Sequence, residues 1–463
     1  MNADRKSSIK HIAELIAQLK SLEEENLRLR QQVDQLLNEL EQTKALATKY
    51  RFESDKKSKK STKGNVLKFK LATVLFADAQ GQTHLSEKNV SDQLVDNLDE
   101  VFIELENIVG KHELRKLRSL GDSIMCVGGI PNKNMTNPIE VVTAAIEMQY
   151  YIKVLQNSYG ADKIWSMRFG VHTGPATATI NGRTKISYEV KGDTVNLSTR
   201  IRSFCEPGNI LISENTYELV KDLIDCEYFT RMPVKYRGNI ELYYVKGIKK
   251  DFSLQGKGII PNKDFSVRFG LIQFTDLQEL MLNKLEKELP EYLYYHNVKH
   301  TIDVVTQVEL IGIGEGVDDS ELLLLKTAAL FHDSGHILSY DDHEHFGTMI
   351  AREVLPDYFY TSRQIDKICE LIMATKMPPK PQNKLEKIMC DADLDYLGRS
   401  DMIPVSNTLY RELKEMNKIG AINDWNKLQI KFISGHQYFT KTAQSLREVN
   451  KQKQIERIRS LIE

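Results

Sequence analysis

The sequence predicts a multidomain chain with an N-terminal parallel coiled coil, an α+β domain and an all-α C-terminal domain. A heptad repeat of apolar residues runs through residues 12–50. Short apolar strands alternate with amphipathic helices between residues 67 and 250, and helical periodicity dominates from residue 273 onward. We therefore divide the chain into a coiled coil (1–55), a basic linker (56–66), an α+β domain (67–250), a second linker (251–272) and a helical domain (273–463).

Composition indicates a folded protein of a reducing compartment. The chain has 463 residues, of which 41% are hydrophobic and 27% are charged, and this is enough for two or three domains. Its net charge of -1 gives no overall field that would attract nucleic acid or an anionic membrane. The five cysteines are scattered without CxxC spacing, which argues against a disulfide or zinc framework. No signal peptide or membrane-spanning run is visible, so we expect a cytoplasmic protein with no membrane segment and no nucleic-acid partner.

The N-terminal heptads favour a homodimer. With Ile12 at position a, four consecutive d positions are leucine. Asn26 lies at another a position, where a buried amide fixes the register of a parallel two-stranded coil. The alternative is a solvent-exposed helix that packs on its own domain. The lysine-rich segment after Tyr50 indicates a solvated linker rather than a segment that binds lipid or nucleic acid.

The stretch LATVLFADAQGQT, residues 71–83, predicts a strand that delivers one carboxylate to its end. The carboxylate belongs to Asp78, and a turn that contains Gly81 follows at once. A carboxylate in this position is typical of a metal site. The backbone N–H groups from Ala79 to Thr83 could then cradle substrate phosphates.

A second carboxylate, Asp122, follows Gly121 in LRSLGDSIMCVGG, where the pattern predicts a hairpin strand. Two carboxylates on adjacent strands could share two hard cations such as Mg²⁺, which prefer carboxylate oxygens together with substrate phosphates. A pair of metal ions can activate an attacking hydroxyl and neutralise a leaving phosphate.

A third motif lies on a predicted helix in the same domain. Residues 94–105 and 141–155 have helical spacing, and residues 124–129 and 167–173 have the pattern of strands. Further along, Gly192 precedes a predicted helix that places Asn196 and Arg200 on one face at i and i+4. An amide and a guanidinium on one face suit a ribose oxygen and a phosphate, because arginine offers a fixed fork of donors. For Arg200 alone, a surface ion pair is the alternative.

Residues 67–250 resemble the catalytic domain of class III adenylyl and guanylyl cyclases in four ordered motifs: FADAQGQT, RSLGDSIM, RFGVHTG and VKGDTVNLSTR. The resemblance implies that Asp78 and Asp122 hold two Mg²⁺ or Mn²⁺ ions. It implies that Asn196 orients the ribose and that Arg200 stabilises the transition state at the α-phosphate. In this family the aspartate pair and the Asn/Arg pair face each other across a dimer interface. The implied reaction is attack of the ribose 3′-hydroxyl on the α-phosphate, which releases pyrophosphate.

The resemblance also assigns substrate contacts. VKYRGNIELYYV is similar to the segment that supplies a basic residue to the β/γ-phosphates, and Lys235 and Arg237 both fit. The two positions that read the purine are occupied by Arg118 and Glu189. Adenine-specific members usually have Lys and Asp there, and guanine-specific members usually have Glu and Cys. A carboxylate accepts from the adenine 6-amino group but would oppose the guanine O6 as acceptor against acceptor, so ATP is the expected substrate.

Histidines concentrate in the helical domain, where six of the eleven fall between His296 and His345. They lie in YHNVKHT, FHDSGH and DDHEHFG, and the later segment CDADLDYLGR adds three aspartates. Imidazole and carboxylate ligands at this density predict a nitrogen/oxygen metal site that keeps open positions for water and phosphate. The expected ligands are His300, His332, Asp333 and Asp393.

Residues 273–463 resemble the HD superfamily of metal-dependent phosphohydrolases, and YHNVKHT is similar to the start of the cyclic-nucleotide phosphodiesterase motif. By this resemblance His296 protonates the leaving oxygen, while His336 and His343 ligate a second ion, either Mg²⁺ or a divalent transition metal. Asp391 lies two residues from Asp393 and competes with it for the metal. A degenerate helical domain kept for regulation is the alternative, because superfamily membership does not fix the substrate.

The sequence thus predicts a homodimeric cyclase that converts ATP to 3′,5′-cyclic AMP, with an HD domain that hydrolyses a phosphoester such as a cyclic nucleotide. Three alternatives stay open. The chain could be a guanylate cyclase, a phosphodiesterase whose cyclase fold senses nucleotide, or a coiled-coil signalling scaffold without enzyme activity.

Overall fold

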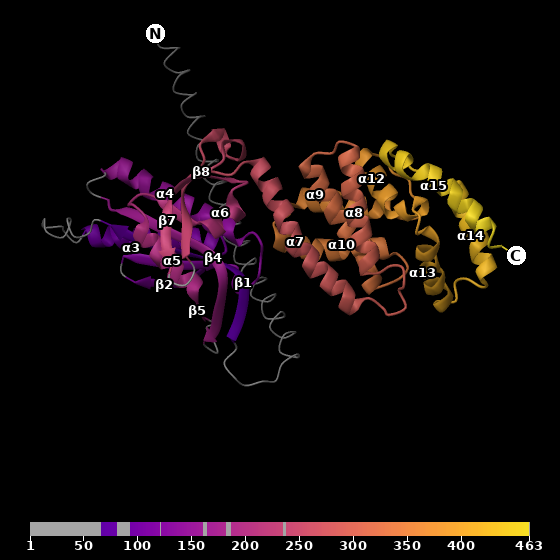
Figure 1. Cartoon of the computed structure of the whole chain (residues 1–463), viewed down its shortest axis with the longest axis horizontal. Helices are drawn as coiled ribbons and strands as arrows, with labels where there is room; N and C mark the ends of the chain where they lie inside the picture. The colour runs from indigo at the N-terminus through magenta and orange to yellow at the C-terminus, as the bar shows by residue number, and fades with distance from the viewer. Residues whose placement is uncertain are drawn as a thin grey trace, which may run out of the picture. The chain divides into compact units, whose positions relative to one another are not determined.

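The computed structural model describes residues 66–80, 93–120, 122–160, 164–181, 187–234 and 238–462, which are drawn as coloured ribbons in Figure 1. The predicted coiled coil and all of the predicted basic linker except Val66 lie outside these residues. Among the helices that are described, none is both long enough and apolar enough to span a membrane.

The N-terminal part of the described chain is built on a mixed sheet. Within the described residues the sheet has eight strands in the order β2-β3-β1-β4-β6-β8-β7, and β5 pairs with β4 off this path. Paired strands run antiparallel except β4 and β6, which run parallel. The strands are β1 (Val66–Gln80), β2 (Arg115–Leu120), β3 (Ser123–Gly128), β4 (Ser166–Asn181), β5 (Ser187–Lys191), β6 (Ile210–Ser213), β7 (Ile224–Val234) and β8 (Gly238–Ile248).

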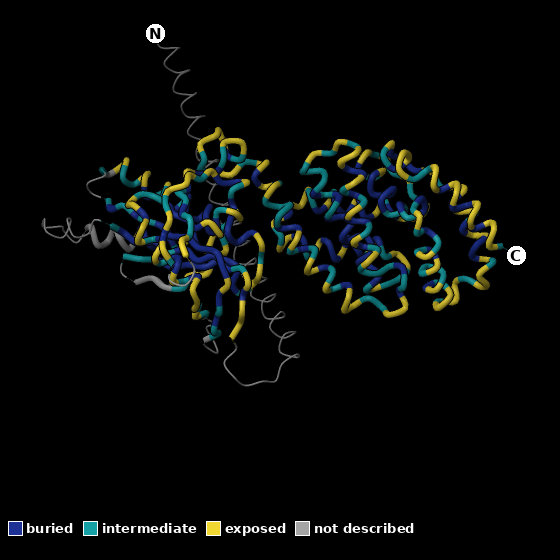
Figure 2. The backbone as a smooth tube through the Cα atoms, in the orientation of Figure 1, coloured by how far each residue is buried: buried dark blue, intermediate teal, exposed yellow. Residues whose placement is uncertain are grey.

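Helices cover this sheet on both faces, so its central strands are buried on both sides (Figure 2). On β1, Leu75 packs into the core that includes residues of α3 and α4, whereas Val74 packs into a separate cluster on the other face. This alternation follows from the two-residue period of a strand. The helices of this domain are α3 (Gln93–Lys111), α4 (Asn137–Tyr159), α5 (Asp193–Phe204) and α6 (Glu214–Val220). The helices predicted at 94–105 and 141–155 and the strands predicted at 124–129 and 167–173 are confirmed.

Helix α5 is held tightly against β4. It begins after Gly192, as predicted, where a φ of 133° favours glycine. Leu197 and Ile201 bury its inner face. A Cβ added at Gly170 of β4 would lie 2.2 Å from the backbone nitrogen of Arg202, so only glycine permits this approach. The backbone around Arg202 is therefore fixed against the sheet.

The range predicted as a second linker contains regular structure. Two short 3-10 turns, η1 (Lys250–Phe252) and η2 (Leu254–Gly256), precede helix α7 (Lys263–Glu288). Phe265 of α7 belongs to the core of the sheet domain, and Phe274 belongs to the core of the helical domain. The second half of 251–272 is thus helical, because its apolar residues have partners that the local sequence does not reveal.

The C-terminal part of the described chain is all-α, as predicted. Capping side chains define several of its helix starts. Asn297 accepts from the backbone N–H groups of Lys299 and His300, and Asp318 with Glu321 forms a capping box. The elements are α8 (Val298–Gly314), α9 (Asp319–Phe331), η3 (Ser334–Ile337), α10 (His343–Val354), η4 (Leu355–Tyr358), α11 (Ser362–Ala374), α12 (Lys384–Asp393), η5 (Asp395–Gly398), α13 (Met402–Glu415), α14 (Ile422–Gly435) and α15 (Lys441–Arg459).

One glycine brings the histidine-bearing segments of this domain together. A Cβ added at Gly335 of η3 would lie 1.9 Å from the carbonyl oxygen of His343. Glycine therefore allows the turn that follows Asp333 to lie directly against the first turn of α10.

Candidate active sites

The first candidate site surrounds Asp78, near the end of β1. Its carboxylate is buried, with 5% of the residue exposed. In the antiparallel register Asp78 stands opposite Arg168 on one neighbouring strand and Ser123 on the other. The sequence pattern therefore placed Asp78 correctly at the end of a strand in the centre of the sheet.

Two arginines neutralise this carboxylate. Arg168 donates from Nε to Oδ1 at 2.8 Å and from Nη2 to Oδ2 at 3.0 Å. Arg202 of α5 forms a second ion pair through Nη1 with Oδ2. Gln80 also donates to Oδ2, at 3.0 Å. The hydrogen bonds that Arg168 donates to Asp78 raise the pKa of the Arg168 guanidinium, which therefore stays charged.

Asp122 lies beside Asp78 in the fold. It occupies the turn between β2 and β3, and its carbonyl oxygen accepts from the backbone N–H of Ala79 at 2.8 Å. Asp122 thus lies in the turn just before β3, the strand that pairs with β1, rather than within a strand as the sequence pattern predicted. Oxygen donors in this arrangement have the chemistry that Mg²⁺ and Mn²⁺ require.

The predicted Asn/Arg pair faces away from this carboxylate. Asn196 and Arg200 are both exposed on α5. Arg200 donates to the carbonyl oxygen of Pro233 at 2.8 Å. Because successive helical residues are about 100° apart, Arg200 and Arg202 point in nearly opposite directions. Within one chain, Arg202 rather than Arg200 therefore reaches Asp78.

The predicted substrate contacts are described only in part. Arg118 lies on β2 and Glu189 on β5, and these two strands contact each other. The Glu189 carboxylate is exposed and lies 2.9 Å from Nζ of Lys191. Four other predicted contacts lie outside the described residues: Gly81, Thr83, Lys235 and Arg237.

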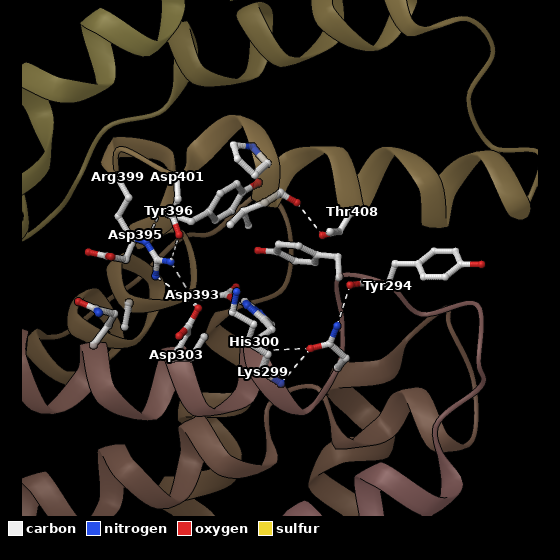
Figure 3. A pocket seen from close by; sticks show the side chains of 17 residues that line it. Tyr294, Lys299, His300, Asp303, Asp393, Asp395, Tyr396, Arg399, Asp401 and Thr408 are labelled. Atoms are coloured by element: carbon white, nitrogen blue, oxygen red, sulfur yellow. Dashed lines mark hydrogen bonds and ion pairs between the residues drawn. The ribbon is translucent and has the colours of Figure 1, made fainter.

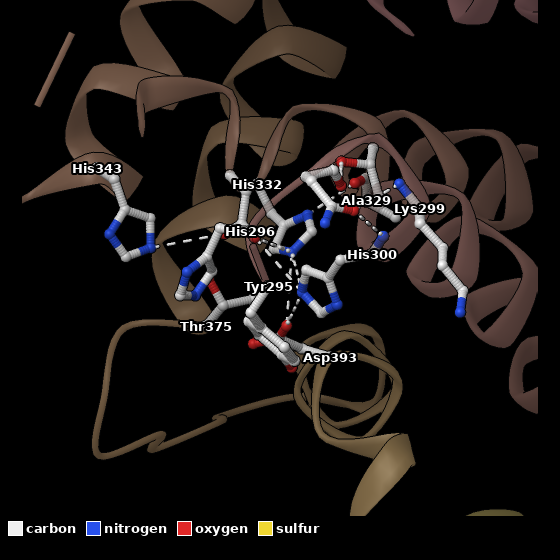
Figure 4. Close-up of polar contacts among 12 residues, drawn as sticks. Tyr295, His296, Lys299, His300, Ala329, His332, His343, Thr375 and Asp393 are labelled. Atoms are coloured by element: carbon white, nitrogen blue, oxygen red, sulfur yellow. Dashed lines mark hydrogen bonds and ion pairs between the residues drawn. The ribbon is translucent and has the colours of Figure 1, made fainter. Parts of the chain in front are cut away.

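The second candidate site brings four predicted ligands together in the helical domain, and Figure 4 labels three of them, His300, His332 and Asp393. The Nε2 atom of His300 lies 3.2 Å from Oδ1 of Asp393 and 3.4 Å from Oδ2 of Asp333. The Nε2 atom of His332 lies 3.4 Å from Oδ1 of Asp393 and 3.2 Å from Oδ2 of Asp333. Ligands bound at about 2.0–2.2 Å from one ion are separated by about 3–3.5 Å, so this set fits a divalent cation. Oδ2 of Asp333 is buried without a hydrogen-bond partner, which also fits a ligand atom.

A second group of donors lies on the other side of Asp333. Oδ1 of Asp333 lies 3.6 Å from Nε2 of His343, and the rings of His336 and His343 stack with centroids 4.0 Å apart. Both ring nitrogens of His336 are buried without a partner. Burial lowers the pKa of His336 to about 2, so its imidazole is neutral and available to a metal. Asp333 is thus positioned between two possible ions.

Backbone carbonyls orient two of these imidazoles. Nδ1 of His332 donates to the carbonyl oxygen of Ala329 at 2.8 Å, and Nδ1 of His343 lies 3.2 Å from the carbonyl oxygen of Tyr340. A proton on Nδ1 leaves Nε2 as the metal-facing atom. Burial opposes the charged form of His332, but the neighbouring Asp333 and Asp393 raise its pKa well above the usual range.

The structure separates Asp391 from Asp393, which the sequence left as competitors. Asp391 is fully buried and accepts from the backbone N–H groups of Phe439 and Thr440 at 2.8–3.1 Å, and from the Thr440 hydroxyl at 2.7 Å. It therefore holds the start of α15. Asp393, at the end of α12, is the one that faces His300 and His332.

Glu412 of α13 is a partner of His296 that the sequence analysis missed. Its Oε1 lies 2.5 Å from Nδ1 of His296, and its Oε2 accepts from the backbone N–H groups of Tyr295 and His296 at 2.9 and 3.2 Å. Burial alone would lower the pKa of His296, but the hydrogen bond to Glu412 and the negative charges of Asp333, Glu412 and Asp393 together raise it. In the sequence, Glu412 lies on the same helix face as the apolar residues Val405 and Leu409. An acidic residue on an apolar face was the signal that could have indicated a buried carboxylate.

Three further polar residues were also missed. Arg168 lies inside a motif that was recognised but carried no assigned role, and Arg202 lies two residues after Arg200. Glu344 is a buried carboxylate whose Oε1 lies 3.6 Å from Nε2 of His343. No local pattern distinguishes these three from ordinary surface charges.

Two cavities flank the donor set and share Tyr295, Asp393 and Tyr396. The first has a volume of about 300 Å³ and is lined in part by charged side chains; among them, Arg399 pairs with Asp401 at 2.6 Å (Figure 3). The second has a volume of about 310 Å³ and adjoins His296 and His343. Its wall is largely apolar and includes Met377, Leu397, Met402, Trp425, Phe432 and the amide of Gln429.

Comparison with known proteins gives two family matches. Residues 65–247 match the model described as the adenylate and guanylate cyclase catalytic domain, and residues 297–395 match the HD domain model. These ranges contain the two candidate sites, except that His296 precedes the second match by one residue and Glu412 lies beyond it.

Known relatives cover the first of these regions. Receptor-type guanylate cyclase gcy-8 of Caenorhabditis elegans is 30% identical over 189 residues, 40% of this chain and 16% of that protein. An adenylate cyclase of Mycobacterium bovis is 30% identical over 182 residues, 39% of this chain and 41% of that protein. The chain thus spans less than half the length of either relative. The crystal structure of the adenylyl cyclase CyaB from P. aeruginosa matches with 31% identity and a TM-score of 0.37, covering 40% of this chain and 98% of that one.

Substitution of Asp391 and of Asp393 gives a matched pair of variants that tests which aspartate binds metal. We expect Asp393→Asn to lower the metal content of the purified chain, because it weakens a charged ligand. Asp391→Asn should keep the metal but lower the melting temperature, since weaker hydrogen bonds to residues 439 and 440 cost about 1–3 kcal/mol. Elemental analysis and thermal melting measure both effects. Loss of metal in Asp391→Asn, with metal retained in Asp393→Asn, would reverse the assignment.

Proposed function

We infer that residues 65–247 of this chain are an adenylate/guanylate cyclase catalytic domain and that residues 297–395 are an HD domain, because they match the models of these two families. From this premise we propose that the chain is a homodimeric adenylate cyclase whose HD domain hydrolyses a phosphoester, with a cyclic nucleotide as the favoured substrate. The observation that supports the cyclase most directly is the arrangement of Asp78, Asp122 and the exposed Asn196/Arg200 face of α5.

The cyclisation step assigns a role to each of these groups. Mg²⁺ or Mn²⁺ held by Asp78 and Asp122 would supply charge neutralisation at the phosphates and activation of the hydroxyl. Asn196 hydrogen-bonds the ribose and holds its 3′-oxygen in line with the α-phosphorus. A bond forms between these two atoms while the bond from the α-phosphorus to the bridging oxygen breaks, and pyrophosphate leaves. Arg200 donates to the oxygens on which negative charge increases.

A dimer is needed because the two halves of the site face apart within one chain. Arg202, not Arg200, reaches Asp78 in its own chain, and the guanidinium of Arg200 is exposed. A second copy related by a two-fold axis could present its Asn196 and Arg200 to Asp78 and Asp122 of the first. The predicted N-terminal coiled coil would raise the effective concentration of the two domains.

ATP is the proposed substrate because of Arg118 and Glu189. These residues come from contacting strands, β2 and β5, and the carboxylate of Glu189 suits the 6-amino group of adenine. The relatives include both guanylate and adenylate cyclases. Base selectivity therefore depends on the residues of this chain itself.

In the HD domain, the proposal is supported by the convergence of His300, His332, Asp333 and Asp393 beside an apolar cavity of about 310 Å³. Metal ions held there would supply activation of the attacking water. The cavity is large enough to receive an apolar ring such as a purine while the phosphate lies at the metal ligands. His296 adjoins this cavity and is hydrogen-bonded by Glu412, one of the groups that raise its pKa, and it would donate a proton to the leaving ribose oxygen.

Exchange of the base-reading pair should change the preferred nucleotide. We expect the wild-type chain to turn over ATP in preference to GTP, and Glu189→Cys with Arg118→Glu to shift the ratio toward GTP. A mismatched donor or acceptor costs about 1–3 kcal/mol, so the shift should be roughly tenfold or more. Mass spectrometry of products from each nucleotide with Mn²⁺ measures the ratio. A wild-type preference for GTP would refute the assignment of ATP.

Complementation between inactive chains tests the shared site. Asp78→Asn and Arg200→Ala should each be inactive alone, because every site in either homodimer lacks one essential group. Co-expressed chains should recover roughly a quarter of wild-type activity, since half of the dimers are mixed and each mixed dimer has one intact site of two. If mixed dimers are isolated through two affinity tags and remain inactive, each site is built within one chain.

Removal of the bridging carboxylate tests the HD domain. Asp333→Ala should lower metal-dependent hydrolysis by at least about a hundredfold, because it removes a charged ligand shared by both donor groups. If the domain degrades the product of the cyclase, the variant should accumulate more cyclic AMP at an unchanged initial rate of cyclisation. A time course of ATP, pyrophosphate, cyclic AMP and AMP measures both reactions. Unchanged hydrolysis of every nucleotide, with metal still bound, would contradict the role of Asp333.

A further inference from the structure

More hydrogen-bond donors point at the carboxylate of Asp78 than its oxygens can accept in good geometry. Its Oδ2 atom alone accepts from Arg168, Arg202 and Gln80. A carboxylate oxygen has two lone pairs, so three donors compete for it. Two of them carry a positive charge, and together they reverse the local charge from negative to positive. A divalent cation that approaches Asp78 therefore meets a site from which at least one guanidinium must leave.

Arg168 is fixed more firmly than Arg202. Its two hydrogen bonds, at 2.8 and 3.0 Å, form a bidentate pair with Asp78. It also stands directly opposite Asp78 in the β1–β4 register. Parallel N–H···O bonds of this kind are the strongest arginine–carboxylate geometry. Displacement of Arg168 would therefore cost more than displacement of a singly bonded side chain.

Arg202 has the weaker position. It contacts Asp78 through Nη1 alone, and its Nε is buried without a hydrogen-bond partner. Its guanidinium carbon lies 4.6 Å above the ring centroid of Phe76, and 17% of its side chain is exposed. An unpartnered buried donor is unfavourable, so a move of this side chain toward solvent would recover hydration.

Movement is limited to the side chain. The backbone of Arg202 is held against Gly170, where a Cβ would lie 2.2 Å from its nitrogen. Rotation about the side-chain bonds can release Asp78 without any shift of α5. The helix that carries Asn196 and Arg200 then keeps its place during metal loading.

We propose that Arg202 is an internal counter-ion of Asp78 that competes with Mg²⁺ or Mn²⁺ for this carboxylate and must leave it when the ion binds. This inference depends on the proposed role of Asp78 as a metal ligand. Arg202 is then a positioning residue that sets the concentration of metal at which the site fills. A chain without this cation should bind the ion more tightly.

Direct binding of Mn²⁺ to the full chain tests this proposal. Free Mn²⁺ is measured by electron paramagnetic resonance during a titration without nucleotide. Because the HD domain also offers ligands, the Asp78→Asn chain gives the binding that does not depend on Asp78. Subtraction of this curve isolates the cyclase site.

In Arg202→Gln, the binding that depends on Asp78 should become about five- to tenfold tighter, as expected when one partly buried ion pair no longer competes. Arg202→Lys keeps the charge and should shift the affinity less. Arg231→Gln is the matched control, because Arg231 is an exposed arginine that pairs with Glu241 at 2.8 Å, away from Asp78. It should leave binding unchanged.

The outcomes separate the two proposals. If Asp78→Asn removes no Mn²⁺ binding, the metal role of Asp78 fails and the inference fails with it. If binding depends on Asp78 but Arg202→Gln does not tighten it, only the counter-ion role is wrong. Should Arg202→Gln fail to fold, as judged by circular dichroism, Arg202→Met decides in its place, because it also removes the charge, and an affinity equal to or weaker than that of the wild type contradicts the proposal.

Discussion

A carboxylate buried away from water requires a counter-charge, and both candidate sites are organised around this constraint. In the sheet domain, Asp78 is balanced by two arginines, which stay protonated at any ordinary pH. In the helical domain, Asp333 and Asp393 are balanced by imidazoles, and the pKa of His332 is raised by these neighbours. A histidine can lose its proton when a metal ion binds. An arginine stays charged, so its side chain must move away from the carboxylate. The two sites therefore meet the same requirement in different ways.

The geometry of one helix decides how the cyclase site is divided. Two residues along α5 correspond to a rotation of about 200° around the helix axis, so the side chains of Arg200 and Arg202 lie on opposite faces of the helix. Arg202 is directed inward by the close contact at Gly170, and Arg200 is left exposed with Asn196. In the proposed mechanism, a single chain thus presents two incomplete half-sites. This is the physical basis on which an active dimer is proposed.

In the helical domain, a few hydrogen bonds keep the metal-facing atoms available. Carbonyl oxygens fix the orientation of His332 and His343 through their Nδ1 atoms, and Gly335 permits the close packing of η3 against α10. Glu412 holds His296 beside the apolar cavity. Residues from α8, α9, α10, α12 and α13 thus contribute to one site. Packing of the helices, rather than any single segment, gives the site its shape.

The sequence by itself determined the features that depend on local pattern. The strand that ends near Asp78, the helix that starts after Gly192, and the concentration of histidines were all recognised, because strand period, helix period and residue type are readable within a few residues. Only the tertiary structure decided between Asp391 and Asp393, since both lie on α12 and their partners lie on different elements. It alone paired His296 with Glu412, which is 116 residues away, and Arg202 with Asp78, which is 124 residues away. Such pairs arise from the packing of distant elements, and local periodicity carries no information about that packing.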